Sequence, residues 1–137
     1  MVETPAAALT VTALAREVDF FSIGTNNLTG YTLACDCGDA AVAALYQPAH
    51  PAVLRLIGMV VAAAREAGRH VTICGEMAGD PALALVLVGL GVDELSMAPA
   101  RLPAVRAAIH VRTYADLAAL AERACALATA EEVLAIV

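Results

Sequence analysis

The sequence predicts an α/β fold in which helices pack outside a parallel sheet. Short apolar segments that suit strands alternate along the chain with longer segments that suit helices. Each apolar segment is followed by a polar or glycine-containing turn and then by a helix, as in parallel βαβ units. The three segments are residues 18–23, 71–74 and 93–97. Because they are mostly apolar, we expect these strands to be buried on both faces.

Length and charge limit what the protein can be. Its 137 residues and 61% hydrophobic content suit one folded domain, but they are too few for a complete (β/α)₈ barrel, which needs roughly 200–250 residues. The net charge is −6, and all eight basic residues are arginines scattered along the chain. Because phosphate backbones are bound by clustered positive charge, this pattern argues against a nucleic-acid partner.

Targeting signals and cysteines point to a cytoplasmic protein. The longest apolar run, residues 82–92, is about half the ~20 residues that a membrane-spanning helix needs. Glu3 and the absence of a basic leader argue against a signal peptide. Cys35 and Cys37 are too close together for a disulfide scaffold and lack the partners of a zinc site, so free thiols are expected.

The N-terminal half of the chain carries clear helix boundaries. Thr4 followed by proline predicts the start of a helix over residues 6–17. Residues 24–39 are polar and punctuated by glycine, which predicts a long functional loop. A further helix is expected over residues 51–67, ending at Gly68.

The C-terminal half contains four more expected helices. Asp80 and Pro81 predict the start of a buried helix that ends at Gly89 or Leu90. The remaining helices are expected over residues 104–110, 114–127 and 131–137. In parallel sheets, functional residues gather where the strands end. In this chain, those ends are residues 24–27, 74–76 and 96–99.

Five segments at and around these strand ends keep the order and spacing of one enzyme family. They read VETPAAALT, VDFFSIGTNNLTGYTLA, LYQPAHPAVLRLI, TICGEMAGDP and GLGVDELSMAPARLP. The chain resembles the C-terminal, phosphoenolpyruvate-binding barrel of phosphoenolpyruvate–protein phosphotransferase, enzyme I of the bacterial sugar phosphotransferase system. The resemblance covers essentially the whole chain. Pyruvate phosphate dikinase and phosphoenolpyruvate synthase share the barrel and the CGE element, whereas DFFSIGTN is more typical of enzyme I.

The resemblance implies that residues 1–137 form part of a (β/α)₈ barrel domain. Residues 1–3 would end the fifth strand, and the three apolar segments would be the sixth, seventh and eighth strands. The earlier strands, which carry the family's substrate-binding arginines, and the domain with the phosphorylated histidine have no counterpart in this sequence.

The resemblance also implies a magnesium site. Glu3 matches one of two carboxylates that hold Mg²⁺ in the family, although from the residues alone it would be a solvated surface acid. The second carboxylate falls at Asn27, whose amide oxygen is neutral. Because such sites depend on charge neutralisation, we expect weakened magnesium binding.

Substrate-binding residues are partly altered. Asn26 matches an asparagine that contacts phosphate, although an asparagine in a turn would explain it without the resemblance. Cys37 stands where the family has a phosphate-binding arginine, which removes a charge-assisted contact. Gly30 replaces a glutamine.

Cys74 matches the family's catalytic cysteine, the acid that protonates the enolate of pyruvate on carbon. A thiol suits this step because it is largely protonated at neutral pH. Without the resemblance, a buried structural cysteine is the simpler interpretation, and we assign that role to Cys35 and Cys125. Gly75 allows a close backbone approach to a ligand, and Glu76 either orients its neighbours or caps a helix.

The sequence therefore predicts a fragment of an enzyme that binds phosphoenolpyruvate and Mg²⁺ and passes phosphoryl to a protein histidine. The partner in the family is the histidine phosphocarrier protein. The isolated chain is expected to be inactive. Alternatives are a non-catalytic dimerisation or regulatory module, a decayed reading frame, or a piece of a pyruvate phosphate dikinase or phosphoenolpyruvate synthase. The three histidines are expected to be surface or packing residues.

A homo-oligomer is also expected. A half barrel would leave two strand edges open. Its inner face, predicted to be mostly apolar, would expose several hundred Å² of apolar surface to water, which two copies could cover by pairing.

Overall fold

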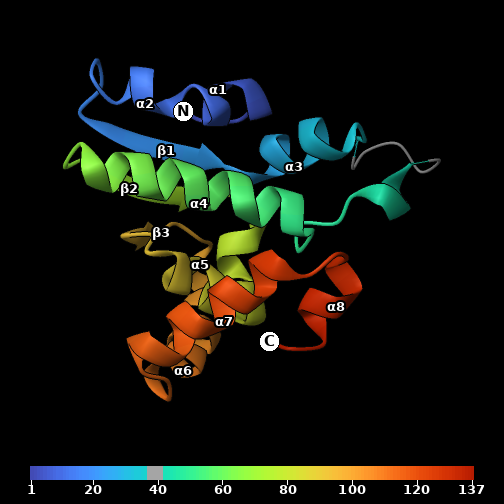
Figure 1. Ribbon diagram of the computed structural model, residues 1–137. Helices are drawn as coiled ribbons and strands as arrows, with labels where there is room; N and C mark the ends of the chain where they lie inside the picture. The colour runs from blue at the N-terminus through green and yellow to red at the C-terminus, as the bar shows by residue number, and fades with distance from the viewer. Residues whose placement is uncertain (37–41) are drawn as a thin grey trace.

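A computed structural model describes residues 1–36 and 42–137. Figure 1 shows an open parallel sheet in the order β1 (Phe20–Gly24), β2 (His70–Cys74) and β3 (Glu94–Leu95). The α-helices are α1 (Pro5–Leu9), α2 (Val11–Leu14), α3 (Thr25–Leu33), α4 (Pro51–Glu66), α5 (Pro81–Leu90), α6 (Leu102–His110), α7 (Tyr114–Ala126) and α8 (Ala130–Leu134). Short 3₁₀ turns are η1 (Ala43–Leu45), η2 (Glu76–Gly79) and η3 (Pro99–Arg101).

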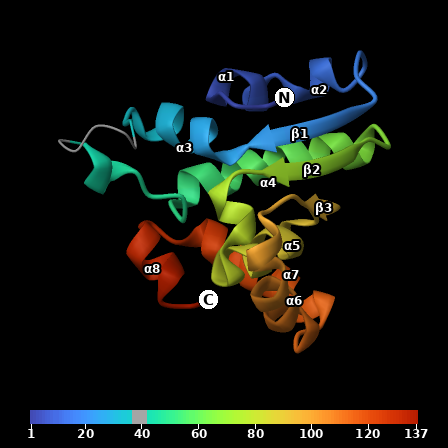
Figure 2. The same ribbon diagram turned by 180° about the vertical axis from the view of Figure 1, so that it is seen from behind.

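The two faces of the sheet differ in chemistry. Helix α4 covers the face that buries Phe21, Ile23, Val71 and Ile73. Figure 2 shows the opposite side, where no helix crosses in front of β1 and β2. The strand residues that alternate with the buried ones are exposed or half-buried, and most are polar. They are Phe20, Ser22, His70, Thr72 and Cys74.

The expectation that the strands are buried on both faces, and that the inner face is mostly apolar, is therefore wrong. Successive side chains of a strand point to opposite faces, so each segment divides its residues between two environments. The apolar residues of β1 and β2 fall on the helix-covered face, with Phe20 as the exception.

The first residues of the chain extend the sheet beyond β1. Val2 forms a parallel bridge with Ile23. Its backbone N–H donates to Ser22 O at 2.8 Å, and its carbonyl accepts from Gly24 N at 3.0 Å. The outer edge of β1 is thus partly occupied, and Glu3 is brought beside Gly24.

Several predicted helix starts are confirmed. Thr4 Oγ1 accepts from Ala7 N at 3.2 Å at the start of α1. Asp80 Oδ1 accepts from the first free backbone N–H groups of α5, at 2.9 and 3.0 Å. His50, just before α4, accepts from Ala52 N at 3.1 Å through Nδ1. These side chains satisfy N–H groups that have no partner within the helix.

Other predicted elements differ from the structure. The helix expected over residues 6–17 is divided at Thr10, whose hydroxyl donates to Ala6 O at 2.9 Å. The prediction of a long loop over residues 24–39 is wrong, because helix α3 occupies most of this range. Buried Leu28 and Thr29 pack α3 into the domain, so tertiary contacts favour a helix that its own sequence supports poorly. The third strand is shorter than expected.

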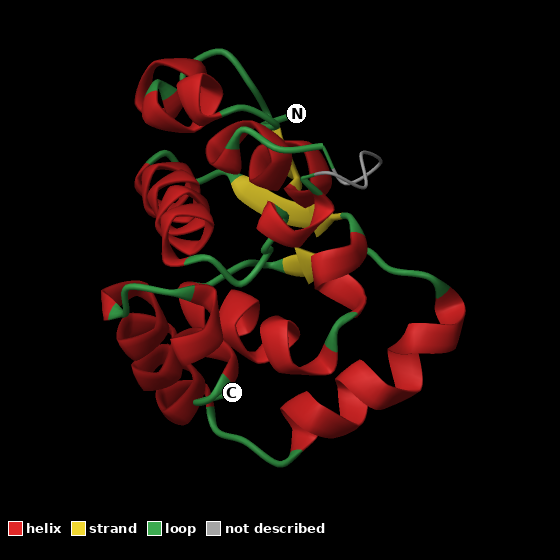
Figure 3. Ribbon diagram, turned by 90° about the vertical axis from the view of Figure 1, so that its right-hand side faces the viewer, coloured by secondary structure: helices red, strands yellow, loops and turns green. Residues whose placement is uncertain are grey.

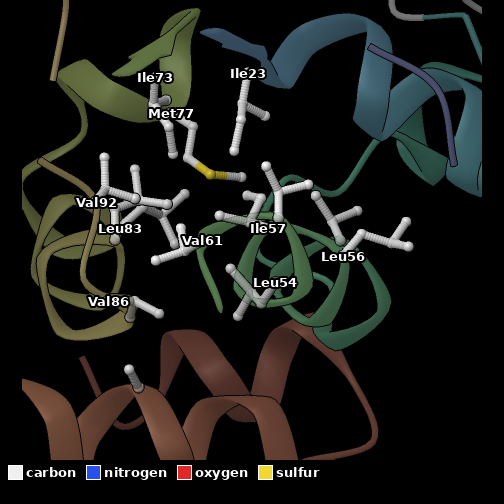
Figure 4. Close-up of a cluster of buried hydrophobic side chains, with 14 of the residues drawn as sticks. Ile23, Leu54, Leu56, Ile57, Val61, Ile73, Met77, Leu83, Val86 and Val92 are labelled. Carbon is white, nitrogen blue, oxygen red and sulfur yellow. The ribbon is translucent and has the colours of Figure 1, made fainter. Parts of the chain in front are cut away.

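The hydrophobic core lies between the covered face of the sheet and helices α4 and α5. Figure 4 shows part of it, with Met77 from η2 among side chains of β1, β2 and α4. Helices α6, α7 and α8 group with α5 on one side of the strands, whereas α1, α2 and α3 lie on the other side, beside β1 and α4 (Figure 1), so that Figure 3 shows helices on both sides of the strands. Helices α5 and α7 pack closely at Gly89, where a Cβ would overlap the carbonyl of Leu117. Among the described residues, no helix combines the length and apolarity needed to cross a bilayer.

Candidate active site at the carboxyl ends of the strands

A cavity of about 570 Å³ opens at the carboxyl ends of the three strands. It lies where the connections after β1, β2 and β3 meet, which is where α/β proteins place their ligands. Its described lining consists of Asn26, Cys74, Gly75, Glu76, Gly79, Ser96, Met97, Ala98 and Arg101. The structure therefore brings Asn26 and Cys74 into one cavity.

The ends of β1 and β2 are joined by two hydrogen bonds. Gly24 and Cys74 are register partners, so the residues that follow each strand start side by side. The hydroxyl of buried Thr25 donates to Cys74 O at 3.1 Å. Asn26 Oδ1 accepts from the backbone N–H of Glu76 at 3.1 Å. Both bonds run from the start of α3 to the turn after β2, so they fix one wall of the cavity.

Gly75 is required by this close approach. Its φ of +116° lies in a region that L-residues rarely adopt. A Cβ at this position would overlap Thr25 Oγ1 and would lie 2.9 Å from Asn26 Oδ1. The glycine of the CGE element therefore allows the backbone to approach the neighbouring strand connection.

Cys74 lines the cavity and belongs to the sheet face that no helix covers. It is half-buried, and Sγ lies 3.7 Å from Ser22 Oγ and 3.6 Å from Ile23 O. The thiol can donate to that carbonyl. A protonated thiol that lines a cavity can give a proton to a bound reactant, provided the reactant lies within reach.

Glu3 and Asn27 lie together, but not in the described lining of the Cys74 cavity. Asn27 Nδ2 donates to Glu3 Oε1 at 3.0 Å. The Glu3 side chain lies across Gly24, where a Cβ would come within 2.6 Å of Oε1. Asn27 lines a neighbouring cavity of about 240 Å³, which Asn26 shares.

This pair does not fit a tight magnesium site. Mg²⁺ needs oxygen ligands arranged around it, usually including carboxylates. Here one carboxylate is engaged by an amide N–H, which occupies the side of Glu3 that faces Asn27. Within the described residues, no group of three or more His, Cys, Asp or Glu side chains is placed to hold a metal ion.

Arg101 is a cavity residue that sequence reasoning missed. It belongs to η3, which follows β3 and turns the chain back toward η2. The end of the third strand was expected to contribute residues 96–99, and Ser96 and Met97 do line the cavity. Arg101 lies in no segment with a helical or strand pattern, so only its position soon after that strand end could have indicated it.

The other described cysteines and histidines do not line the Cys74 cavity. Cys37 falls outside the described residues. Burial raises the pKa of the Cys125 thiol, and the nearby Arg55 charge partly opposes that rise. Arg55 also donates through Nε to Cys125 O at 2.6 Å, so this cysteine belongs to a packing contact between α4 and the end of α7. Cys35 is half-buried beside the smaller cavity.

His70 lies at the opposite end of the sheet from the cavity. Its ring nitrogens lie 3.7 Å from Asp93 Oδ2 and 3.5 Å from Glu94 Oε2. This agrees with the expectation that the histidines are surface or packing residues, because half of the His70 side chain is exposed, at 51%. His110 is exposed at the end of α6.

Most of the chain, including the cavity, matches the model of a known protein family. Residues 1–114 match the model described as "PEP-utilising enzyme, PEP-binding domain". The chain belongs to this family. The matched range contains every described residue that lines the cavity, including Arg101.

Three similar proteins carry names that refer to phosphoryl transfer. The chain is 47% identical over 133 residues to "Phosphoenolpyruvate-protein phosphotransferase" of Haemophilus influenzae, covering 97% of the chain and 23% of that protein. It is 48% identical over its whole length to the protein of the same name from Geobacillus stearothermophilus, covering 24% of it. It is 50% identical over 136 residues to "Multiphosphoryl transfer protein" of Xanthomonas campestris, covering 99% of the chain and 16% of the relative. The chain thus spans about a quarter or less of these relatives.

Proposed function

We propose that the chain is the last part of a phosphoenolpyruvate-binding (β/α)₈ barrel, and that it serves phosphoryl transfer from phosphoenolpyruvate to a protein histidine. The observation that carries this proposal is the cavity that joins Asn26, Cys74 and the CGE turn at the carboxyl ends of parallel strands. Residues 1–137 then form one incomplete domain. The bridge between Val2 and Ile23 supports this, because it starts a further parallel strand beside β1.

In this proposal Cys74 is the acid that protonates the enolate of pyruvate. After the phosphoryl group leaves phosphoenolpyruvate, the enolate carbon takes the thiol proton, which leaves a thiolate and pyruvate. Asn26 would contact the phosphate, and its bond to Glu76 N holds its amide at the cavity wall. The assignment of Cys37 to phosphate binding rests on the resemblance alone.

Glu3 and Asn27 give little support to the binding of Mg²⁺ by this chain. Glu3 would be the one charged ligand of the ion, and Asn27 could offer only a neutral amide oxygen after breaking its bond to Glu3. We therefore assign no step to the ion in this chain. The proposed protein partner is a histidine phosphocarrier protein, and the isolated chain should not transfer phosphoryl to it, because the domain that would carry the phosphohistidine is absent from these residues.

We also propose that the chain self-associates, but through a different surface from the inner sheet face that the sequence suggested. The uncovered sheet face is mainly polar, so it gives little hydrophobic drive. An apolar groove of about 350 Å³ instead lies beside the short edge strand β3, with Leu95, Leu102 and Ile109 in its lining. A second copy could cover that edge. Sedimentation at low micromolar concentration should show a dimer or larger species, and a single 14.0 kDa species would contradict this part.

The cavity can be tested directly by an NMR titration of the 137-residue chain with phosphoenolpyruvate. Saturable shifts of the Gly75 and Glu76 amide signals are expected, because both groups lie at the cavity wall. Shifts confined to His70 and Asp93, at the opposite end of the sheet, would contradict the proposed site.

A further inference from the structure

The cavity beside Cys74 contains a positive charge that the proposed function has not used. Among the described residues that line it, Arg101 is the one cationic side chain. Glu76 is the one anionic side chain in that set, and it is exposed. A small acidic ligand would therefore meet one attractive and one repulsive charge in this cavity.

The aliphatic part of the Arg101 side chain lies close to the backbone of η2, because Gly79 has no side chain. A Cβ at Gly79, the last residue of η2, would lie 3.2 Å from Arg101 Cγ and 3.4 Å from Arg101 Cβ. Because Gly79 has no side chain, the arginine stem lies against the backbone of η2, next to Met97. The start of the arginine stem thus lies at the cavity wall, while the residue as a whole is exposed.

The guanidinium group is available to a ligand. Throughout residues 1–36 and 42–137, the structure gives the Arg101 side chain no ion pair and no hydrogen bond. By contrast, Arg55 donates to Cys125 O and Leu127 O, and Arg69 donates to Ala15 O. Those two arginines join segments of the fold, whereas Arg101 lines a cavity.

We propose that Arg101 binds an oxyanion of the small acidic ligand that enters this cavity. A guanidinium group presents parallel N–H donors that match two oxygens of a phosphate or a carboxylate. Arg101 is thus a binding residue that supplies the positive charge, while Cys74 remains the acid. The identity of the ligand as phosphoenolpyruvate rests on the proposed function, but the role of Arg101 rests on the cavity itself.

The test compares two arginines of the same segment in the 137-residue chain. Arg101→Gln removes the charge in the cavity, and Arg106→Gln removes an equal charge from α6. Both arginines are exposed, but Arg106 lines the groove beside β3 instead of the cavity. Each variant is titrated by calorimetry with phosphoenolpyruvate, inorganic phosphate and pyruvate. We expect Arg101→Gln to weaken binding about tenfold or more, and Arg106→Gln to leave it near the wild-type value.

Two further variants sharpen the result. Glu76→Gln should tighten binding of the same anions, because it removes the repulsive charge while keeping the size of the side chain. Arg101→Lys should fall between wild type and Arg101→Gln, because it keeps the charge but loses the fork of donors. A loss seen with phosphate alone assigns the phosphoryl group to Arg101, and a loss seen with pyruvate alone assigns the carboxylate.

The outcomes separate this inference from the proposed function. Phosphoenolpyruvate binding that is equal in wild type and Arg101→Gln overturns the inference and leaves the proposed function standing. An equal loss in Arg101→Gln and Arg106→Gln also overturns it, since that pattern reports net charge. Phosphate or pyruvate binding that depends on Arg101, without phosphoenolpyruvate binding, supports the inference and contradicts the proposed function. Failure of the wild type to bind any of the three anions contradicts both.

Discussion

The two ends of the sheet use polar side chains in different ways. At the amino end, His70 faces Asp93 and Glu94 across an exposed surface, and Asp93 also accepts from Val71 N at 2.8 Å. At the carboxyl end, Thr25 and Asn26 bond to the backbone of the next strand connection. At the amino end, the imidazole of His70 faces two carboxylates, and one of them, that of Asp93, also holds the backbone of β2. Those at the carboxyl end fix a wall and leave a thiol and a guanidinium group facing a cavity.

This difference shows which polar residues of the sheet belong to the fold and which are free for chemistry. Exposed ion pairs contribute little to stability, because water screens them and the side chains lose freedom. Bonds from side chains to backbone in a partly buried site contribute more, and losing one leaves a group without a partner. Substitution of Thr25 at the carboxyl end should therefore cost more stability than substitution of His70 at the amino end, where only Asp93 bonds to the backbone.

The largest effect is expected for Gly75→Ala. The positive φ alone costs about 1–3 kcal/mol for a residue with a Cβ, and the overlap with Thr25 Oγ1 adds to that. Gly68→Ala is the matched control near the amino end, with φ +67° and no atom within 4 Å of the new Cβ. Urea unfolding should show a clearly larger loss for Gly75→Ala. Equal losses would mean that the approach to Thr25 is not a constraint.

The next largest effect is expected when a second carboxylate is placed beside Glu3 at the carboxyl end of the sheet. Asn27→Asp replaces the amide that donates to Glu3 with a second carboxylate, so the pair should repel until a cation binds. Mg²⁺ at ten times its dissociation constant would then stabilise the variant by about 1.4 kcal/mol. Thermal melts with and without Mg²⁺ measure this. A wild type that responds to Mg²⁺ as strongly as the variant would refute the account of this pair.

A smaller effect is expected for Thr25→Val. The substitution keeps the shape of a buried side chain but removes the donor to Cys74 O, at a cost of about 1 kcal/mol. His70→Ala, which removes the exposed contacts of the imidazole with Asp93 and Glu94, should change stability by less than about 0.5 kcal/mol. The denaturant midpoints of the two variants measure these losses of stability. A larger loss in His70→Ala than in Thr25→Val would contradict the comparison of the two ends.

The smallest effect lies outside the sheet, at the starts of α7 and α8. Hydrogen bonds from Thr113 lower the pKa of Asp116, and bonds from Ala128 and Thr129 lower that of Glu132. A carboxyl with a lower pKa when folded stabilises the fold above its unfolded pKa, and this contribution is lost as the pH falls through the folded pKa. Asp116→Asn should therefore lower stability at neutral pH, and the difference should shrink in acid. A difference that grows in acid would contradict this.

The sequence predicted those parts of the fold that have local signals. Asp80 before proline and Thr4 before proline mark helix starts in the structure because side-chain caps act within a few residues. Helix α3 was missed because it contains asparagine, glycine and threonine, and its stability depends on burying Leu28 against other helices. Pattern reasoning cannot supply such a distant contact.

The site was also only partly predictable, because some of its residues are brought together by contacts between distant parts of the chain. Cys74 and Asn26 were expected together because both follow neighbouring parallel strands, and the structure brings them together. The polar face of the sheet could have been found from Ser22 and Thr72, which alternate with apolar residues. Arg101 reaches the cavity through a turn whose path no local pattern specifies.

Protection of Cys74 from alkylation tests the central claim, that the carboxyl-end cavity binds the ligand, most directly. The chain is treated with a thiol reagent with and without phosphoenolpyruvate, and each cysteine is quantified by mass spectrometry. Cys125, which lies near the end of α7 and is not among the described residues that line the cavity, serves as the internal control. The account predicts that phosphoenolpyruvate slows modification of Cys74 and leaves Cys125 unchanged. Modification of Cys74 at the same rate with and without saturating ligand would contradict it.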